Sequence, residues 1–128
     1  MEFFKYNALV PELAVKDFSV SKHFYIDILG FKLEYERPRE KFAFLSFGDA
    51  QIMIHQCNEN WVTGFCEYPF GRGINFEIEC RDVVELRDRI IARGVALFKD
   101  VYEVTYHQRP QKEFLVRDPD GYLLQFSQ

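Results

Sequence analysis

Hydrophobic and polar positions follow the same order twice along the chain. Each half contains a short apolar strand, an Asp, an apolar series at helical spacing and a Gly. These parts are residues 13–15, Asp17, 24–29 and Gly30 in the first half, and residues 76–78, Asp82, 83–91 and Gly94 in the second. An Asp can cap the free amides of a helix, and a Gly can adopt the left-handed backbone that ends one. The pattern predicts an internal duplication built on a strand and a capped helix.

Three strand-like runs follow each predicted helix. They cover 32–36, 42–47 and 51–56 in the first half, and 97–102, 111–117 and 122–127 in the second. Asp118-Pro119-Asp120-Gly121 has the residues of a type I turn between the last two strands. Residues 58–73 form the expected linker, and 102–110 the expected matching loop. The prediction is one α+β domain over 1–128, made of two βαβββ modules at about 1–60 and 70–128.

This fold class has a consequence for binding. A βαβββ unit packs its helix on one face of a curved mixed sheet and leaves the other face bare. Two such units, within one chain or across a dimer, would form a groove, which is a common type of small-molecule site.

Composition excludes some classes of partner and location. The net charge of −4 and pI near 5.4 argue against nucleic-acid binding, which needs clustered Lys and Arg. No run is long and apolar enough to span a membrane, and the first five residues do not resemble a signal peptide, so a cytoplasmic protein is expected. The three cysteines, Cys57, Cys66 and Cys80, fit neither a disulfide framework nor a zinc motif, and we expect them to be reduced. The 14 Phe and 7 Tyr can line a cavity as well as fill a core.

Several motifs together resemble those of one superfamily. The motifs are Val15-Lys16-Asp17, Phe24-Tyr25, Leu29-Gly30-Phe31, 69–76 (PFGRGINF) and 113–122 (EFLVRDPDGY). The chain is similar to the vicinal-oxygen-chelate superfamily, and within it to the glyoxalase/bleomycin-resistance group. The resemblance implies paired βαβββ modules and a homodimer with sites at module interfaces.

Metal-using members of this superfamily carry His, Glu or Gln ligands on four strands. The corresponding positions here are Val10, Gly73, Gln125 and one residue within 52–55. Since Val10 and Gly73 offer no ligand side chain, we expect no metal, no other cofactor and no catalytic residue. Glu12, Asn75 and Glu77 could face the cavity by strand alternation, or they could be solvated polar positions.

The expected ligand contacts are mostly aromatic, with a few polar groups. They are Tyr35, Phe42, Phe44, His55, Trp61, Phe65, Phe70, Asn75, Tyr102, Tyr106 and Gln125. Aromatic rings stack on planar ligands and attract cations. The same rings could instead close a dimer interface or cap the core, and His55 could be a structural strand histidine.

Three functions remain open at this stage. The first is a bleomycin-resistance-like homodimer that sequesters an aromatic, cationic antibiotic in its groove without covalent chemistry. The second is a metal-dependent lyase, isomerase or dioxygenase, or a thiol transferase, of the same superfamily. The third is a binder of another metabolite. The ligand, and whether modules pair within or between chains, are not identified by the sequence.

Overall fold

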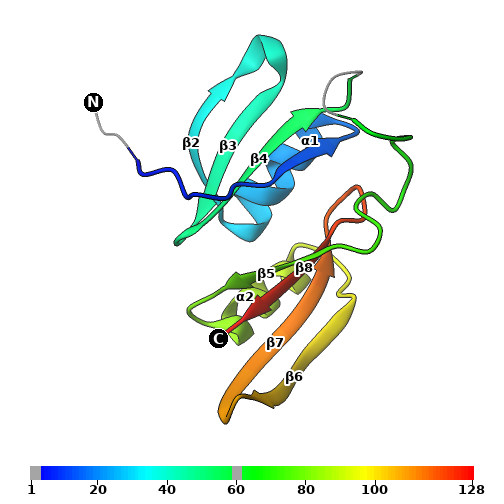
Figure 1. Ribbon diagram of the computed structural model, residues 1–128. Helices are drawn as coiled ribbons and strands as arrows, with labels where there is room; N and C mark the ends of the chain where they lie inside the picture. Colours follow the sequence, from blue (N-terminus) through cyan, green and yellow to red (C-terminus); the bar gives the residue numbers. More distant parts are fainter. Residues whose placement is uncertain (1–3, 59–61) are drawn as a thin grey trace. The chain divides into compact units, whose positions relative to one another are not determined.

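The computed structural model describes residues 4–58 and 62–128 and divides into two units, Met1–Glu67 and Tyr68–Gln128 (Figure 1). Each unit has a four-stranded mixed sheet with a helical segment on one face. The prediction of an α+β fold with two βαβββ modules is confirmed. In the described parts of the chain, no helix is both long and apolar enough to cross a bilayer.

The first unit runs strand, helix, three strands. Its elements are β1 (Glu12–Val15), α1 (Phe18–His23), the π-helical turn η1 (Phe24–Leu29), β2 (Lys32–Arg37), the 3₁₀ turn η2 (Pro38–Glu40), β3 (Phe42–Phe47) and β4 (Ala50–Gln56). The strand order is β1-β4-β3-β2, with β1 parallel to β4 and the other pairs antiparallel.

The second unit repeats this arrangement. Its elements are β5 (Asn75–Glu79), α2 (Val83–Ala92), β6 (Lys99–Tyr106), β7 (Arg109–Arg117) and β8 (Leu123–Ser127). The order β5-β8-β7-β6 has the same parallel and antiparallel pairing as the first sheet.

The helix caps agree with the prediction and include a feature that it missed. The carboxylates of Asp17 and Asp82 accept hydrogen bonds from the amides of Val20 (3.3 Å) and Glu85 (3.1 Å). In addition, a glutamine at or directly after the end of each module's last strand has a side-chain oxygen that accepts a hydrogen bond from the first amide of the helix. Gln56 binds the amide of Phe18 at 3.1 Å, and Gln128 binds that of Val83 at 2.6 Å. The ends of β4 and β8 therefore help to determine the residue at which α1 and α2 begin.

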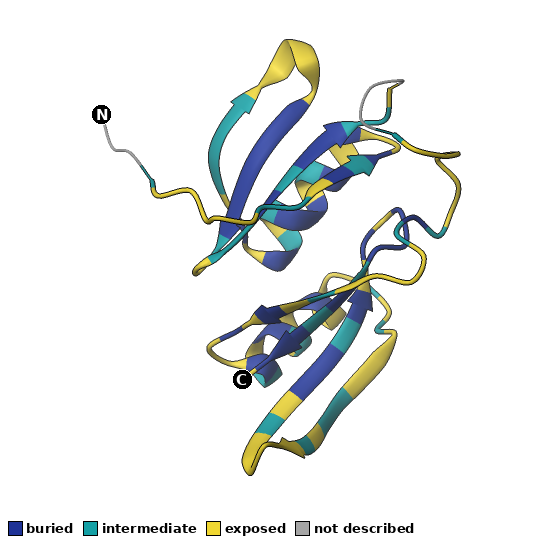
Figure 2. Ribbon diagram, in the orientation of Figure 1, coloured by how far each residue is buried: buried dark blue, intermediate teal, exposed yellow. Residues whose placement is uncertain are grey.

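Strand alternation separates the two faces of each sheet. The helix-side face of the second sheet is apolar, because Ile78, Phe114, Val116, Leu124 and Phe126 are all buried. These residues pack with the buried face of α2, and the corresponding residues of the first sheet are Leu13, Val15, Ala43, Leu45, Ile52 and Ile54 (Figure 2). The side chains that alternate with these residues along each strand point to the face that the helix does not cover, called here the open face.

The predicted loop at 102–110 is wrong. Strands β6 and β7 stay paired up to Tyr106 and Arg109, and only His107 and Gln108 form the turn, both with positive φ. The polar run at 107–110 suggested a loop, but residues 103–106 alternate and include Val, Thr and Tyr, which favour strands. A long hairpin therefore replaces the loop, and Tyr102 and Tyr106 lie on a strand.

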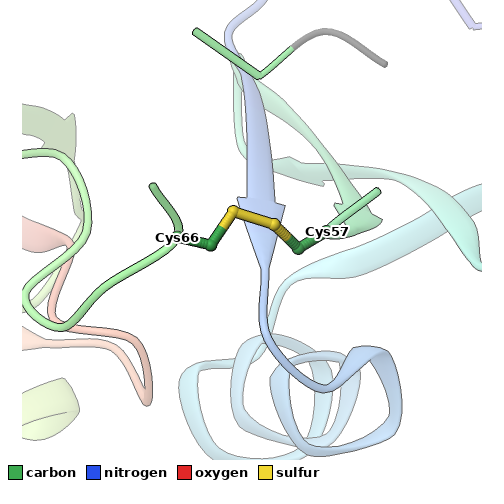
Figure 3. Close-up of a disulfide and its surroundings, with 2 residues drawn as sticks. All are labelled: Cys57 and Cys66. Carbon is green, nitrogen blue, oxygen red and sulfur yellow. A yellow bond between two sulfur atoms is a disulfide. The ribbon is translucent and has the colours of Figure 1, made fainter. Parts of the chain in front are cut away.

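The expectation of three reduced cysteines is also wrong, because Cys57 and Cys66 form a disulfide (Figure 3). Cys57 directly follows β4, and its amide binds the carbonyl of Val15 at 2.7 Å, so one end of the bridge is attached to the sheet. The bridge joins Cys66 to the end of β4, a pairing that spacing alone did not reveal. Cys80 is free and buried, and burial raises the pKa of its thiol.

The turn before β8 has the geometry predicted for it. The carboxylate of Asp118 accepts hydrogen bonds from the amides of Asp120 and Tyr122, both at 2.9 Å. Gly121 adopts a φ of 94°, and a Cβ there would lie 2.7 Å from Cβ of Pro69. The close approach of Pro69 excludes any side chain at this position.

Replacing Gly121 by Ala should destabilise the second unit more than the same change at Gly94. Gly94 has a similar φ of 82°, but a Cβ there would meet nothing within 4 Å. Gly94→Ala should therefore cost only the left-handed backbone penalty, about 1–2 kcal/mol, and Gly121→Ala this plus overpacking of about 1–3 kcal/mol. Urea unfolding followed by circular dichroism measures both. Equal losses would contradict the close packing of Pro69 on Gly121.

The disulfide predicts the thiol content of the protein. Purified without reductant and unfolded in guanidinium, the chain should show one titratable thiol, from Cys80. After reduction it should show three, because both bridge cysteines are released. Cys57→Ser should give two thiols per chain before reduction, which separates the bridge from partial oxidation. Three thiols in the unreduced wild type would contradict the bridge.

Candidate functional site

The open face of the first sheet is aromatic. Tyr35 on β2 and Phe44 on β3 are register partners, and their rings stack with centroids 5.6 Å apart and an interplanar angle of 17°. Phe42, also on β3, lies 5.7 Å from Tyr35. Three residues predicted as ligand contacts are thus brought together on one surface by strand alternation. The prediction that they contact a ligand is taken up below.

The segment before β1 covers part of this aromatic face. Phe4 stacks on Tyr35 (6.1 Å, 27°) and lies 4.8 Å from the ring of Phe44, while Tyr6 meets Phe44 edge-on at 5.1 Å. Gln51 on β4 fastens the segment, since its side chain donates to the carbonyl of Lys5 (2.6 Å) and accepts from the amide of Asn7 (2.7 Å). A cavity of about 460 Å³ lies beside it, lined in part by Phe4 and Gln51.

Charged groups border the same face. The guanidinium of Arg37 lies 3.8 Å from the centroid of Phe42 and 6.0 Å from that of Tyr35. Such distances are typical of cation–π contacts. The aromatic rings of this face therefore already bind a cation from the protein itself, the guanidinium of Arg37.

His55, a predicted ligand contact, is 5% exposed and is the register partner of Phe42. Its Nδ1 lies 2.9 Å from a carboxylate oxygen of Glu12 on β1. The contact lacks the angles of a regular hydrogen bond, and in the described part of the chain neither ring nitrogen has a partner of regular geometry. Glu12 places a negatively charged carboxylate beside the aromatic rings, and His55 places a polar imidazole there.

The open face of the second sheet is polar. Asn75 on β5 donates to Gln125 on β8 at 2.8 Å, and the amide of Gln125 donates to the carboxylate of Glu113 on β7. Two predicted contacts, Asn75 and Gln125, are therefore bonded directly to each other, and Gln125 connects them to Glu113, which was not predicted. Ser127 and Glu77 lie on the same face and are 3.5 Å apart.

Glu113 is the deepest charged group of this network, with no exposed surface. Its Oε2 accepts from Gln125, and the phenols of Tyr102 and Tyr106 also hydrogen-bond to its carboxylate, although Oε1 has no partner of strictly regular geometry among the described residues. The same is true of Oε1 of Gln111, two residues earlier on β7. Leaving a buried polar atom without a partner typically costs about 1–3 kcal/mol, which makes Oε1 of Gln111 a candidate for ligand contact.

Tyr102 and Tyr106 on β6 border Glu113. Burial raises the pKa of both phenols, and the negative charge of Glu113 raises it further, because a second anion is disfavoured there. The ammonium of Lys99 lies 4.1 Å from the ring centroid of Tyr102. Rings, a carboxylate and a cation thus meet on this face as well.

The other predicted contacts lie elsewhere. Phe70 is buried and packs edge-on against Tyr122 at 5.8 Å, in the turn region of the second unit. Phe65 is 94% exposed in the segment between the units. Trp61 lies outside the described residues.

Comparison with known proteins agrees with this architecture. The model of the Glyoxalase/Bleomycin resistance protein/Dioxygenase superfamily matches residues 6–126. The chain belongs to this superfamily. No curated protein sequence matches it.

Solved structures similar to the chain include one close in sequence. A superfamily member from Vibrio splendidus 12B01 is 34% identical over 91% of this chain and 93% of its own, with a TM-score of 0.44. TioX from Micromonospora sp. ML1 is 21% identical over 95% and 98% of the two chains, with a TM-score of 0.75. A virulence protein from Salmonella typhimurium is 22% identical over 98% of both, with a TM-score of 0.73. The last two show a shared fold.

The residues of each unit do not fit a divalent metal. Val10 and Gly73, where the superfamily places ligands, precede β1 and β5. Both ends of the Gln125 amide are used within the protein. Within residues 4–58 and 62–128, no three His, Cys, Asp or Glu side chains form a group that could hold an ion.

Sequence reasoning missed Phe4, Tyr6, Arg37 and Glu113. Glu113 carried a usable signal: it is out of phase with the buried Phe114 and Val116, so it had to lie on the open face with Gln125. Phe4 and Tyr6 carried none, because they precede the first strand and reach the sheet through an irregular segment.

Proposed function

We propose that the protein binds an aromatic compound carrying positive charge and sequesters it without chemical conversion, as expected for the bleomycin-resistance side of its superfamily. One observation carries the proposal. On the open face of the first sheet, Tyr35 and Phe44 already hold the ring of Phe4, and Phe42 already holds the guanidinium of Arg37. The face therefore binds, from its own chain, both a flat ring and a cation.

Electrostatics support a cationic ligand. The chain carries a net charge of −4, and Glu12 and Glu113 bring carboxylates to the two open faces. An aromatic ring stacked on another contributes about 0.5–1.5 kcal/mol, and a cation over a ring about 0.5–2 kcal/mol. Several such contacts account for a small-molecule affinity without a metal or a nucleophile.

The superfamily alternative is a metal-dependent lyase, isomerase or dioxygenase. It is less well supported, since the donor groups of each unit do not fit an ion. A binder of another aromatic metabolite would use the same rings, so the experiment below tests the identity of the drug.

The proposal also includes a homodimer. Light scattering should detect it as twice the 15.3 kDa mass of one chain.

Isothermal titration with metal-free bleomycin tests the proposal, using protein treated with a chelator and checked for metal. We expect saturable binding by the wild type. Tyr35→Ala should weaken it about three- to tenfold, because one stacking partner is lost. Phe98→Ala is the matched control, because Phe98 is an aromatic ring of the second unit that is 51% exposed. This variant should bind the drug as the wild type does.

Two results would contradict the proposal. One is the absence of binding by chelator-treated wild type at millimolar drug. The other is a stoichiometric ion that resists chelation and is required for turnover of a substrate.

A further inference from the structure

We infer that residues 4–7, called here the strap, occupy the aromatic open face of the first unit as an internal ligand, and that an external ligand binds there by displacing them. The ligand class that follows is a cationic compound whose aromatic ring is joined to an amide, as in a peptide. The inference rests on the proposed function and deepens it, because it names the groups that the ligand must replace.

The strap makes the ring contacts that a bound ligand would make. The ring of Phe4 lies 6.1 Å from that of Tyr35, at an interplanar angle of 27°, and 4.8 Å from that of Phe44. The ring of Tyr6 meets Phe44 edge-on at 5.1 Å, and its phenol hydrogen-bonds to that of Tyr35. A second ring cannot take this place while Phe4 is there.

The backbone of the strap is recognised as well. Gln51 on β4 accepts a hydrogen bond from the amide of Asn7 at 2.7 Å and donates one to the carbonyl of Lys5 at 2.6 Å. One side chain thus binds both an N–H and a C=O, the two groups that a peptide backbone presents. A ligand that replaces the strap without loss must offer the same donor and acceptor beside its ring.

The strap is held loosely enough to leave. Tyr6 is 57% exposed, and Leu9, between the strap and β1, is 81% exposed. The hydrogen bonds that fasten the strap to Gln51 and to the carbonyl of Asp49 are exposed to solvent. Segments with exposed hydrogen bonds and few buried contacts open locally at low free-energy cost. Opening the strap also leaves the apolar core on the helix side of the sheet intact.

Space for a ligand adjoins the strap. The wall of the cavity of about 460 Å³ includes three strap residues and three sheet residues, which are Phe4, Lys5 and Asn7, and Glu34, Ser46 and Gln51. Ser46 pairs with Gln51 and lies two residues after Phe44 on β3, so the cavity and the aromatic rings share one face. Displacement of the strap therefore joins the cavity to the aromatic surface.

Displacement also changes the charge of this surface. The strap carries one cation, Lys5, and leaves behind the carboxylates of Glu34 and Asp49 in the cavity wall. Lys32 offsets one of them, since its ammonium lies 3.5 Å from Glu34. The opened surface is thus one charge more negative than the closed one. It favours a ligand with a cation beside its ring, as the strap itself has.

Isothermal titration of Phe4→Ala with metal-free bleomycin tests the displacement. A site that is open for only a fraction of the time binds more weakly by that fraction. Loss of the Phe4 ring should therefore tighten drug binding about three- to tenfold. Leu9→Ala is the matched control, because it removes an exposed apolar side chain from the same segment, and it should bind as the wild type does.

The strap added as a separate peptide tests the site without the drug. Acetyl-Phe-Lys-Tyr-Asn-amide should bind the full-length Phe4→Ala/Tyr6→Ala variant and shift amides of β3 and β4 in ¹H–¹⁵N NMR spectra. The wild type should bind it at least about threefold more weakly, because its own strap occupies the site. Acetyl-Ala-Lys-Ala-Asn-amide keeps the charge without the rings and should not bind. The thermal midpoint of each variant shows whether it folds.

The outcomes separate this inference from the proposed function. Unchanged or weaker bleomycin binding by Phe4→Ala would overturn the inference, since Phe4 would then be part of the wall of the site. Equal peptide binding by the wild type and the double variant would overturn it too. Bleomycin binding that is sensitive to Tyr35→Ala would still stand in both cases. Peptide binding by the double variant without any bleomycin binding would support the strap and contradict the drug assignment.

Discussion

Each module depends on a sheet that is packed on one side only. The helix packs against the apolar side chains on one face of the four strands. Because side chains alternate along each strand, the other half of them point to the opposite face. That face has no second layer within its own module. Residues on that face do not need to be apolar to pack against the helix. They can therefore be polar, charged or aromatic groups that contact a ligand.

The duplication shows this division clearly. Positions that hold the module together are the same in both halves: Asp17 and Asp82 cap the helices, and Gln56 and Gln128 bind the first helical amides. Positions on the open faces differ. Strand pairing makes Phe42, opposite His55, the counterpart of Glu113, opposite Ser127. One module has developed an aromatic surface and the other a polar one with a buried charge.

The sequence revealed the features that depend on local rules. Helix caps, strand periods and the Asp118–Gly121 turn were predictable because each is determined by a few neighbouring residues. The length of the β6–β7 hairpin was not, since a polar tip hid strand-forming residues. The bridge between Cys57 and Cys66 and the cover formed by Phe4 and Tyr6 depend on the path of irregular chain, which no period encodes. Of the candidate site, the aromatic residues Tyr35, Phe42 and Phe44 could be named in advance, whereas the hydrogen bond between Gln125 and Glu113 needed the register of β7 against β8.

The central claim is that the open faces, and not the helix-covered ones, are where this protein meets its ligand. A crystal structure of the protein with metal-free bleomycin tests it most directly. The account predicts a heteroaromatic ring of the drug stacked on Tyr35 and Phe44, with the ring of Phe4 displaced. A drug molecule seated against α1 or α2, with Phe4 still on Tyr35, would contradict it.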